Sequence, residues 1–383
     1  MAETAPHTMR VKELYTYPIK SLRGISLPSV SALYTGFPHD RRFMIYNVDQ
    51  QKNMHVAEFP EMCLFTTAFA DDPETKSPQR VIVRYTKDHT FDKPDRKVGV
   101  EPLEVPLTPR TEGLKQLEVN MHLSPCIGYD MGEQYNKWFS DRFGYAVKLL
   151  YIGNNRRKVL GNVPPSVAAK QRAGLAETDG NAQQRAGSSW LSNITSTATS
   201  LVGSVVGRGS AEDKENDNEY EGVDEGLSFA DVAPYLVVST KSWENVQRRL
   251  PDGETVEISK FRPNIIVEGA QEDFEEDYWA KLQIGDEAKF ILTQNCARCT
   301  SLNVDYTTGK VGEGEAGKIL KKLQSDRRVD PGAKWSPVFG RYGFLAKLPS
   351  GKSAAEIKVG DEVKVSERNK DRTRFEWPDL STK

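Results

Sequence analysis

Short runs of alternating apolar and polar residues, each ended by proline, glycine or aspartate, constrain this chain more than any other feature. Residues 10–18, 42–48 and 80–85 form such runs and are rich in β-branched and aromatic side chains. They predict β-strands, because successive side chains of a strand point to opposite faces of a sheet. The chain up to about residue 110 is therefore predicted to be a barrel or a tight sheet.

The pattern changes after these strands. Apolar residues at helical spacing over 134–143 predict a helix, and Gly144 supplies the residue that ends it. Further along, residues 235–239 and 264–268 predict strands, with a helix over 241–250 between them. The chain therefore alternates between element types in a way that favours a mixed fold.

A short internal repeat predicts the architecture of the second half. Residues 282–290 and 357–365 share one plan, in which apolar residues flank a Gly-Asp turn, and both are predicted to be barrel hairpins. We predict a mixed α+β fold rich in β structure. An N-terminal β-barrel domain is expected over residues 8–160 and a second barrel with peripheral helices over 227–370.

Residues 165–226 form a low-complexity insertion between these domains, rich in Ala, Gly, Ser, Thr and Asn and acidic over 211–226. Such a composition buries too little apolar surface to fold by itself. Residues 187–207 carry no charge, and helical winding would place Trp, Leu, Ile and Val opposite Ser, Thr and Gly. This pattern predicts a peripheral membrane helix. The alternatives are a flexible linker or a helix packed on its own protein.

Composition excludes several classes of protein. A net charge of −2 and a pI near 6.3 give no sign of nucleic-acid binding. The chain has 4 cysteines in 383 residues, too few for a disulfide scaffold, which favours a reducing, intracellular compartment. The sequence has no signal peptide and no apolar stretch long enough to span a membrane.

The pair Cys296-x-x-Cys299 is the densest chemical signal. A structural zinc site is poorly supported, because the other cysteines stand singly without a histidine pair. A thioredoxin-like pair is also disfavoured, because strand-like residues follow instead of a helix. One thiolate could bind a soft, redox-active metal, with Arg298 beside it to stabilise the anion. The residues alone leave a buried, inert cysteine pair equally open.

Four motifs together point to a known family. They are Tyr-Pro-Ile-Lys-Ser-Leu-Arg-Gly at 17–24, Asp-Arg-Arg-Phe at 40–43, Lys-Phe-Arg-Pro-Asn at 260–264 and Cys-Ala-Arg-Cys at 296–299, followed by Asp305. In this order and spacing, the chain resembles the MOSC-domain proteins that carry an N-terminal β-barrel. Among these it is most similar to the mitochondrial amidoxime-reducing components. The resemblance covers residues 10–160 and 225–368.

The resemblance implies a molybdenum–molybdopterin cofactor between the two domains, with Cys299 as metal ligand and Cys296 as its neighbour. It implies Asp305 as a second catalytic residue, on the substrate side or the metal side. The residues that match cofactor-holding positions are Lys20, Ser21, Arg42, Ser239, Thr240, Arg262, Asn264 and Arg298. Ser239 and Thr240 align more loosely, and Ala297 replaces a serine common in the family.

Each of these cations also has an ordinary structural alternative. Lys20 and Arg42 are equally typical of solvated charges at a sheet edge, and Arg262 of an ion pair at a rim. The same residue types nevertheless suit a pterin phosphate, because guanidinium and ammonium groups bind such an anion well.

The resemblance implies reduction of N-hydroxylated substrates, such as amidoximes and hydroxylamines, with electrons from a cytochrome b5-type donor and its NADH reductase. The alternative is a module that only carries the cofactor or transfers its sulfur. A self-contained sulfurase is not expected, because the chain begins at the barrel without a pyridoxal-phosphate domain. The expected location is the cytosolic face, with possible peripheral contact of 187–207 to the mitochondrial outer membrane or another membrane.

Overall fold

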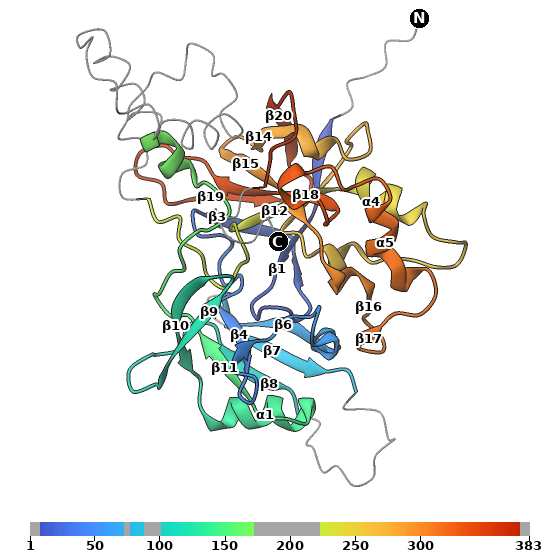
Figure 1. Cartoon of the computed structure of the whole chain (residues 1–383). Helices are drawn as coiled ribbons and strands as arrows, with labels where there is room; N and C mark the ends of the chain where they lie inside the picture. Colours follow the sequence, from blue (N-terminus) through green and yellow to red (C-terminus); the bar gives the residue numbers. More distant parts are fainter. Residues whose placement is uncertain (1–7, 73–76, 88–100, 172–222, 376–383) are drawn as a thin grey trace, which may run out of the picture.

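The computed structural model describes residues 8–72, 77–87, 101–171 and 223–375. They form two β-rich bodies, one above the other in the view of Figure 1. Most of the predicted insertion lies outside the described residues, including 187–207 and the acidic run up to residue 222. Residues 165–171, at its beginning, are helical. No helix in the described ranges is long and apolar enough to cross a membrane.

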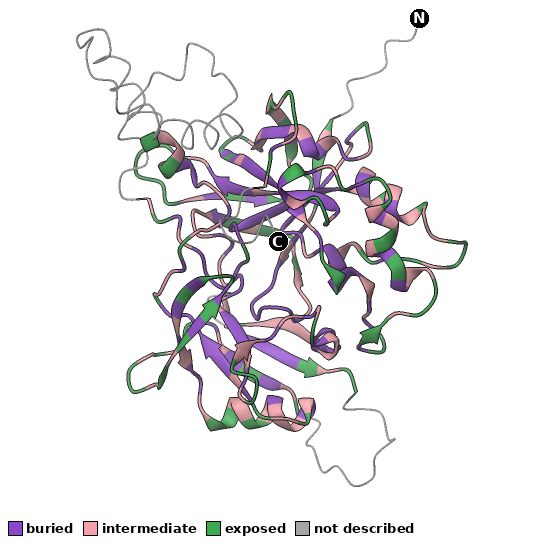
Figure 2. Ribbon diagram, viewed as in Figure 1, coloured by how far each residue is buried: buried purple, intermediate pink, exposed green. Residues whose placement is uncertain are grey.

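The upper body is a closed barrel of seven strands. Its order is β13, β12, β18, β15, β14, β20 and β1, and β1 pairs with β13 to close it. In that order the strands are Ile265–Glu268, Tyr235–Ser239, Val338–Leu345, Ala288–Ala297, Trp279–Ile284, Glu362–Arg368 and Met9–Thr16. Only β12 and β13 run parallel. The side chains of Tyr235, Trp279 and Phe290 are 0% exposed and lie in its core. Figure 2 shows much of the ribbon of the barrel strands as buried.

Strand β1 closes this barrel although it comes first in the chain. Leu14 pairs with Ile265 of β13, and Met9 pairs with Val363 of β20. Two further early strands join the same body. Strand β2 (Ile25–Leu27) pairs with β1, and β3 (Ser29–Leu33) pairs with β19 (Ala354–Lys358). Strands at the start of the predicted N-terminal domain are therefore hydrogen-bonded into the barrel of the C-terminal half.

The lower body consists of two antiparallel sheets and a helix (Figure 1). One sheet has the order β5, β4, β11, β10, β9, which are Lys52–Asn53, Phe43–Asn47, Val147–Tyr151, Ser124–Asp130 and Gln116–Met121. The other has the order β6, β7, β8, which are Phe65–Asp71, Pro78–Tyr85 and Leu103–Pro106. The predicted strands in 42–48 and 80–85 are confirmed as β4 and β7.

Helix α1 (Glu133–Phe143) packs aromatic residues against this body. The ring centroids of Phe139 and Phe143 lie 5.5 Å and 4.8 Å from that of Phe65. The helix ends at Gly144, whose φ of 85° is left-handed, a conformation that glycine adopts without strain. Both the helix and its predicted end are confirmed.

Most of the remaining elements lie at the margin of the barrel, whereas the 3₁₀-helix η1 (Pro60–Leu64) packs in the core of the lower body. Those at the margin are the helices α4 (Thr240–Gln247) and α5 (Ile319–Gln324), the strands β16 (Val304–Asp305) and β17 (Lys310–Val311), and the 3₁₀-helices η2 (Ile258–Phe261), η3 (Glu275–Tyr278), η4 (Thr300–Asn303), η5 (Ala316–Lys318) and η6 (Pro331–Ala333). The prediction of a β-rich mixed fold with two β-rich domains and peripheral helices is confirmed.

One of the two predicted hairpins is wrong. Residues 282–290 do form one, since β14 and β15 pair with Ile284 opposite Ala288. In 357–365 the strands on either side of the turn separate, because β19 pairs with β3 whereas β20 pairs with β14 and β1. The same local sequence plan therefore serves two different connections, since local residues fix the turn but partners elsewhere in the chain fix the pairing.

Truncating Leu14, which is 0% exposed in β1, is expected to destabilise the fold. Leu14→Ala should lower the free energy of unfolding by about 2–5 kcal/mol, because it leaves a cavity where β1 closes the barrel. Urea unfolding measures this. Val359→Ala, at a side chain 46% exposed, is the matched control and should change it by less than about 0.5 kcal/mol. Equal losses in both variants would contradict the closing role of β1.

Candidate cofactor site between the two bodies

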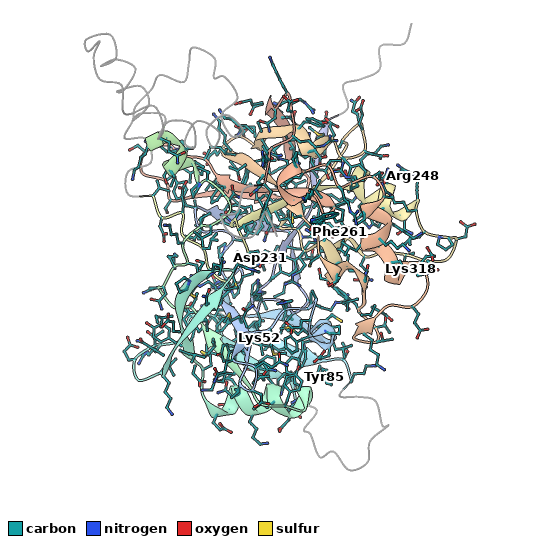
Figure 3. All side chains as sticks on the ribbon, viewed as in Figure 1. Lys52, Tyr85, Asp231, Arg248, Phe261 and Lys318 are labelled. Atoms are coloured by element: carbon teal, nitrogen blue, oxygen red, sulfur yellow. The ribbon has the colours of Figure 1, made fainter. Side chains whose placement is uncertain are left out.

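Lys20 lies at the junction of the two bodies, in the loop after β1. Its backbone N–H donates to the carbonyl of Phe43, 2.8 Å away. Its ammonium donates to the carbonyl of Phe229 at 3.2 Å and pairs with Asp231, which lies between the two bodies in Figure 3. Lys20 is 5% exposed, and burial lowers the pKa of its ammonium although Asp231 opposes the shift. The sequence-predicted lysine is therefore a buried cation.

Two arginines next to Lys20 share one aromatic ring. The guanidinium carbons of Arg41 and Arg262 lie 4.7 Å and 4.3 Å from the ring centroid of Tyr17, within the range of cation–π attraction. The Tyr17 hydroxyl donates to the carbonyl of Pro263 at 3.0 Å, which fixes the ring. Tyr17 and Arg41 are therefore part of the site, although the sequence prediction selected Arg42.

A second aromatic ring repeats this arrangement. Arg23 and Lys260 lie 5.0 Å and 5.5 Å from the ring centroid of Tyr306. Lys260 is 7% exposed, and burial lowers the pKa of its ammonium against the attraction of Glu257 and Asp305. Sequence analysis missed Arg23, Lys260 and Tyr306, although all three stand inside or beside the quoted motifs.

Two nitrogen atoms show that this positive charge is incompletely satisfied. Within the described ranges, Nη2 of Arg262 and Nε of Arg298 are buried without a hydrogen-bond partner. Burial lowers the pKa of Arg262, and the nearby charge of Arg41 adds to the effect. Buried donors are normally paired, because an unpaired one costs about 1–3 kcal/mol. The site is therefore suited to an anion with several oxygen acceptors.

Four of the eight non-glycine residues with a left-handed backbone in the described ranges lie in the segments that form this site. Ser21, His39, Arg41 and Arg262 have φ values of 69°, 65°, 50° and 55°. Side chains other than glycine adopt this left-handed region at a cost of about 1–2 kcal/mol each. Such strain persists only where surrounding contacts enforce it, and it is typical of functional sites. Two of the predicted residues, Ser21 and Arg262, are among the four.

The two cysteines of the Cys-Ala-Arg-Cys motif have different environments. Cys296 is 2% exposed, and burial raises the pKa of its thiol. Arg298 donates from Nη1 to the sulfur of Cys296 at 2.9 Å and from Nη2 to the carbonyl of Phe261 at 2.7 Å. Cys299 is exposed at the start of η4, with its sulfur 3.2 Å from the hydroxyl oxygen of Ser301. Of the pair, Cys299 is thus the accessible thiol.

Asn264 and Ser239 use their side chains to hold the backbone. Asn264 donates to the carbonyl of Tyr15 at 3.2 Å and accepts from Arg41 at 3.3 Å and from the N–H of Leu236 at 3.2 Å. Ser239 caps helix α4, and its hydroxyl donates to the carboxylate of Glu276 at 2.9 Å. Thr240, which follows Ser239 and is also a predicted cofactor-holding residue, is the first residue of α4 and is half-buried.

Arg42 and Asp305 are directed away from this cluster. Arg42 donates to the carbonyl of Gly153 and to the Tyr151 hydroxyl at 3.4 Å, both in the lower body. Asp305 accepts from the N–H of Thr307 at 2.8 Å within its own turn. Slight burial raises the pKa of Asp305, but the hydrogen bonds within the turn outweigh burial and hold this pKa below its usual value. The structure therefore brings together Lys20, Arg262 and Asn264, with Arg41 added, and leaves Arg42 and Asp305 at the periphery.

Comparisons with known proteins agree with this architecture. The family model of the MOSC N-terminal beta barrel domain matches residues 8–146, and that of the MOSC domain matches residues 224–364. The chain belongs to the MOSC-domain proteins with an N-terminal MOSC barrel. The family resemblance inferred from the four motifs is thereby confirmed.

The relatives carry two different names. Mitochondrial amidoxime reducing component 2 of Bos taurus is 37% identical over 142 residues, which are 36% of this chain and 38% of that protein. Mitochondrial amidoxime-reducing component 1 of Mus musculus is 25% identical, and the match covers 92% of this chain and 81% of the mouse protein. Molybdenum cofactor sulfurase of Homo sapiens is 24% identical over 94% of this chain. That match spans only 32% of the sulfurase.

The buried carboxyl of Glu276, which accepts from Ser239 and Ser242, predicts a pH-dependent stability. Burial, reinforced by the charge of Asp277 and opposed by the Ser242 hydrogen bond, raises the pKa of Glu276 from 4.5 to about 7. The folded protein therefore binds this proton more tightly than the unfolded chain. Its contribution to stability is complete below pH 4.5 and is lost as the pH rises through about 7.

The free energy of unfolding should consequently fall by about 2.5 kcal/mol between pH 5 and 8 through this group, at 1.36 kcal/mol per pKa unit. Urea unfolding across this range measures the slope. Glu276→Gln should remove that part of the slope, whereas Glu272→Gln, at an exposed position, should keep it. The assignment fails if the slope survives Glu276→Gln unchanged.

Proposed function

We propose that this protein binds a molybdenum–molybdopterin cofactor and uses it to reduce N-hydroxylated compounds, with Cys299 as the metal ligand. The observation that carries the proposal is a cluster of buried cations at the junction of the two bodies, in which Arg262 and Arg298 each keep a buried nitrogen without a hydrogen-bond partner. Lys20 and Arg262 have lowered pKa values. The amidoxime-reducing relatives from Bos taurus and Mus musculus support the same assignment.

The residues at the junction fit such a cofactor. The phosphate of the pterin is a compact anion, and in the proposed complex Lys20, Arg262 and Ser21 hold it. Arg298, whose Nε is buried and unpaired, provides a donor next to Cys299. Ser239 and Asn264 serve by fixing the ends of β12 and η2, because their own polar atoms are already hydrogen-bonded. Thr240 is a further proposed contact, and Arg42 would act only indirectly, because it donates to Gly153 and Tyr151 of the lower body.

When bound, the molybdenum centre supplies the two electrons needed to break an N–O bond. The protein contributes position and access. Cys299 is exposed, so a substrate reaches its sulfur from solvent without opening the fold. The lowered pKa of Asp305 keeps this carboxylate ionised at neutral pH, so in the proposed reaction it accepts hydrogen bonds and the protons that release water come from solvent. Its neighbour Lys260 limits the local negative charge.

The proposal includes a protein electron donor. The names of the Bos taurus and Mus musculus relatives include the word mitochondrial. On this basis we propose that this protein lies peripherally at the mitochondrial outer membrane. The proposed donor is a cytochrome b5-type protein with its NADH reductase. Membrane contact through residues 187–207 remains part of this proposal and concerns a segment outside the described residues.

A second function is favoured by one observation. The match to the human molybdenum cofactor sulfurase spans 94% of this chain. A module that carries the cofactor or transfers its sulfur would use the same cation cluster and the same exposed cysteine. It would differ in one measurable property, because a molybdenum-loaded carrier would not reduce an amidoxime when supplied with an artificial one-electron donor.

Replacing the proposed metal ligand is the direct test. Cys299→Ala should abolish reduction of benzamidoxime by the molybdenum-loaded protein with reduced methyl viologen, because the thiolate that completes the metal site is lost. Molybdenum analysis should show a lower metal content as well. Cys126→Ala, at a buried thiol in the lower body, is the matched control and should keep both metal and activity. A wild-type protein loaded with molybdenum but inactive would favour the carrier.

Removing one buried cation separates cofactor binding from chemistry. Lys20→Met keeps the length of the side chain but loses the ammonium that would meet the phosphate. Affinity for the pterin should fall about 10- to 100-fold, as for the loss of a hydrogen bond to a charged group. Pterin content, measured after oxidation to its fluorescent form, reports this. Lys52→Met, at an exposed ion pair with Glu58, should retain full pterin content; a parallel loss there would refute a specific role for Lys20.

A further inference from the structure

Trp335 is an unusual side chain for its position. It is 64% exposed, and it is the only aromatic residue among the exposed large hydrophobic side chains of the described ranges. The others are Leu123, Val167, Val311 and Val359. An indole ring buries a large apolar area when it meets a partner, so leaving it in water sacrifices that gain. Exposed rings of this kind are typical of binding surfaces.

Strand pairing places Trp335 beside the accessible cysteine. Ala297 at the end of β15 pairs with Val338 at the start of β18. The next pair continues the ladder, because the N–H of Arg298 donates to the carbonyl of Pro337 at 2.8 Å. Neighbouring antiparallel chains lie about 5 Å apart. Cys299 follows this last pair by one residue and Trp335 precedes it by two, so both lie at the same end of the β15–β18 pair.

The segment that carries Trp335 is held firmly. Asp330, 1% exposed, caps η6 by accepting from the N–H of Gly332 at 2.9 Å and also accepts from the N–H of Phe375 at 2.9 Å. After η6, the N–H of Ser336 donates to the carbonyl of Ala333 at 2.8 Å. The amide of Gln324 in α5 donates to the carbonyl of Trp335 itself at 3.4 Å. The backbone that carries the ring is therefore held in place, which lowers the ordering cost upon binding.

The surroundings of the ring define the ligand that it suits. The Lys334 ammonium lies 5.2 Å from the indole centroid, which places a positive charge next to the ring. A cationic ligand would be repelled by the Lys334 ammonium. A flat, neutral ligand gains both stacking on the indole and burial of its own apolar face. N-hydroxyamidines with an aryl group are flat and only weakly basic, so they are largely neutral near pH 7.

We propose that Trp335 is a specificity-determining residue, an aromatic platform at the rim of Cys299 that binds the aryl group of a neutral N-hydroxylated substrate. This inference rests on the proposed function for the identity of the substrate. It adds a preference that the cation cluster cannot provide, since the cations contact the anionic end of the cofactor and not the ring of a substrate. The platform binds the part of the substrate that does not react.

Steady-state kinetics with two substrates tests this platform. Trp335→Ala should raise KM for benzamidoxime about three- to tenfold with kcat unchanged, as expected for the loss of one aromatic contact. Acetamidoxime, which has no ring, should show no such change. Trp335→Phe should restore most of the affinity for benzamidoxime, and Val167→Ala, another exposed apolar position, should leave both substrates unaffected. Equal changes for the two substrates, or none for either, would overturn the proposal.

A binding measurement separates this inference from the proposed function. Benzamidoxime titrated into Cys299→Ala protein should quench indole fluorescence, and the additional variant Trp335→Phe should abolish that component of the quenching. This readout does not need turnover. If the molybdenum-loaded wild type reduces neither substrate, the proposed function fails, while the quenching still decides the role of Trp335. Identical quenching with and without the Trp335 indole would show that the aryl group does not bind to Trp335, which would overturn the proposal.

Discussion

Arg41 and Arg262 contact the same tyrosine ring, and the geometry of the junction depends on how their like charges are accommodated. The electron-rich face of Tyr17 attracts both guanidinium groups, and the Tyr17 hydroxyl is itself tied to the backbone carbonyl of Pro263. Both arginines also have a left-handed backbone. The carboxylate of Asp40 pairs with Arg41, whereas Nη2 of Arg262 is buried without a hydrogen-bond partner, so the repulsion between the two cations is only partly compensated.

This junction is assembled from segments that are distant in the chain. The loop after β1 brings Lys20, the approach to β4 brings Arg41, and the end of η2 brings Arg262. The segment after the insertion adds Asp231 and binds the lower body through the N–H of Phe229, which donates to the carbonyl of Arg41 at 2.9 Å. Because no single body contains the whole cluster, the site forms only when the two bodies pack against each other.

The sequence predicted strands and the helix over 134–143 better than it predicted the orientation of single side chains. Periodicity and turn residues are local, so β4, β7 and α1 could be recognised. The choice between Arg41 and Arg42 could not, because adjacent side chains diverge and the turn before β4 decides which one points inward. The partner of Ser239, Glu276, is likewise distant in the chain and has no local signal, whereas Asp305 bonds to Thr307 within its own turn.

The closure of the upper barrel by β1 has a consequence for how the molecule acquires its shape. Six of the seven barrel strands come from residues 235–368, whereas the seventh, β1, lies before all of them in the chain and is synthesised earlier. Strand β1 cannot pair with its barrel neighbours β13 and β20 until they have been synthesised. Pairing between such distant segments slows folding, and a fragment that begins after the insertion would carry two open sheet edges able to join other chains.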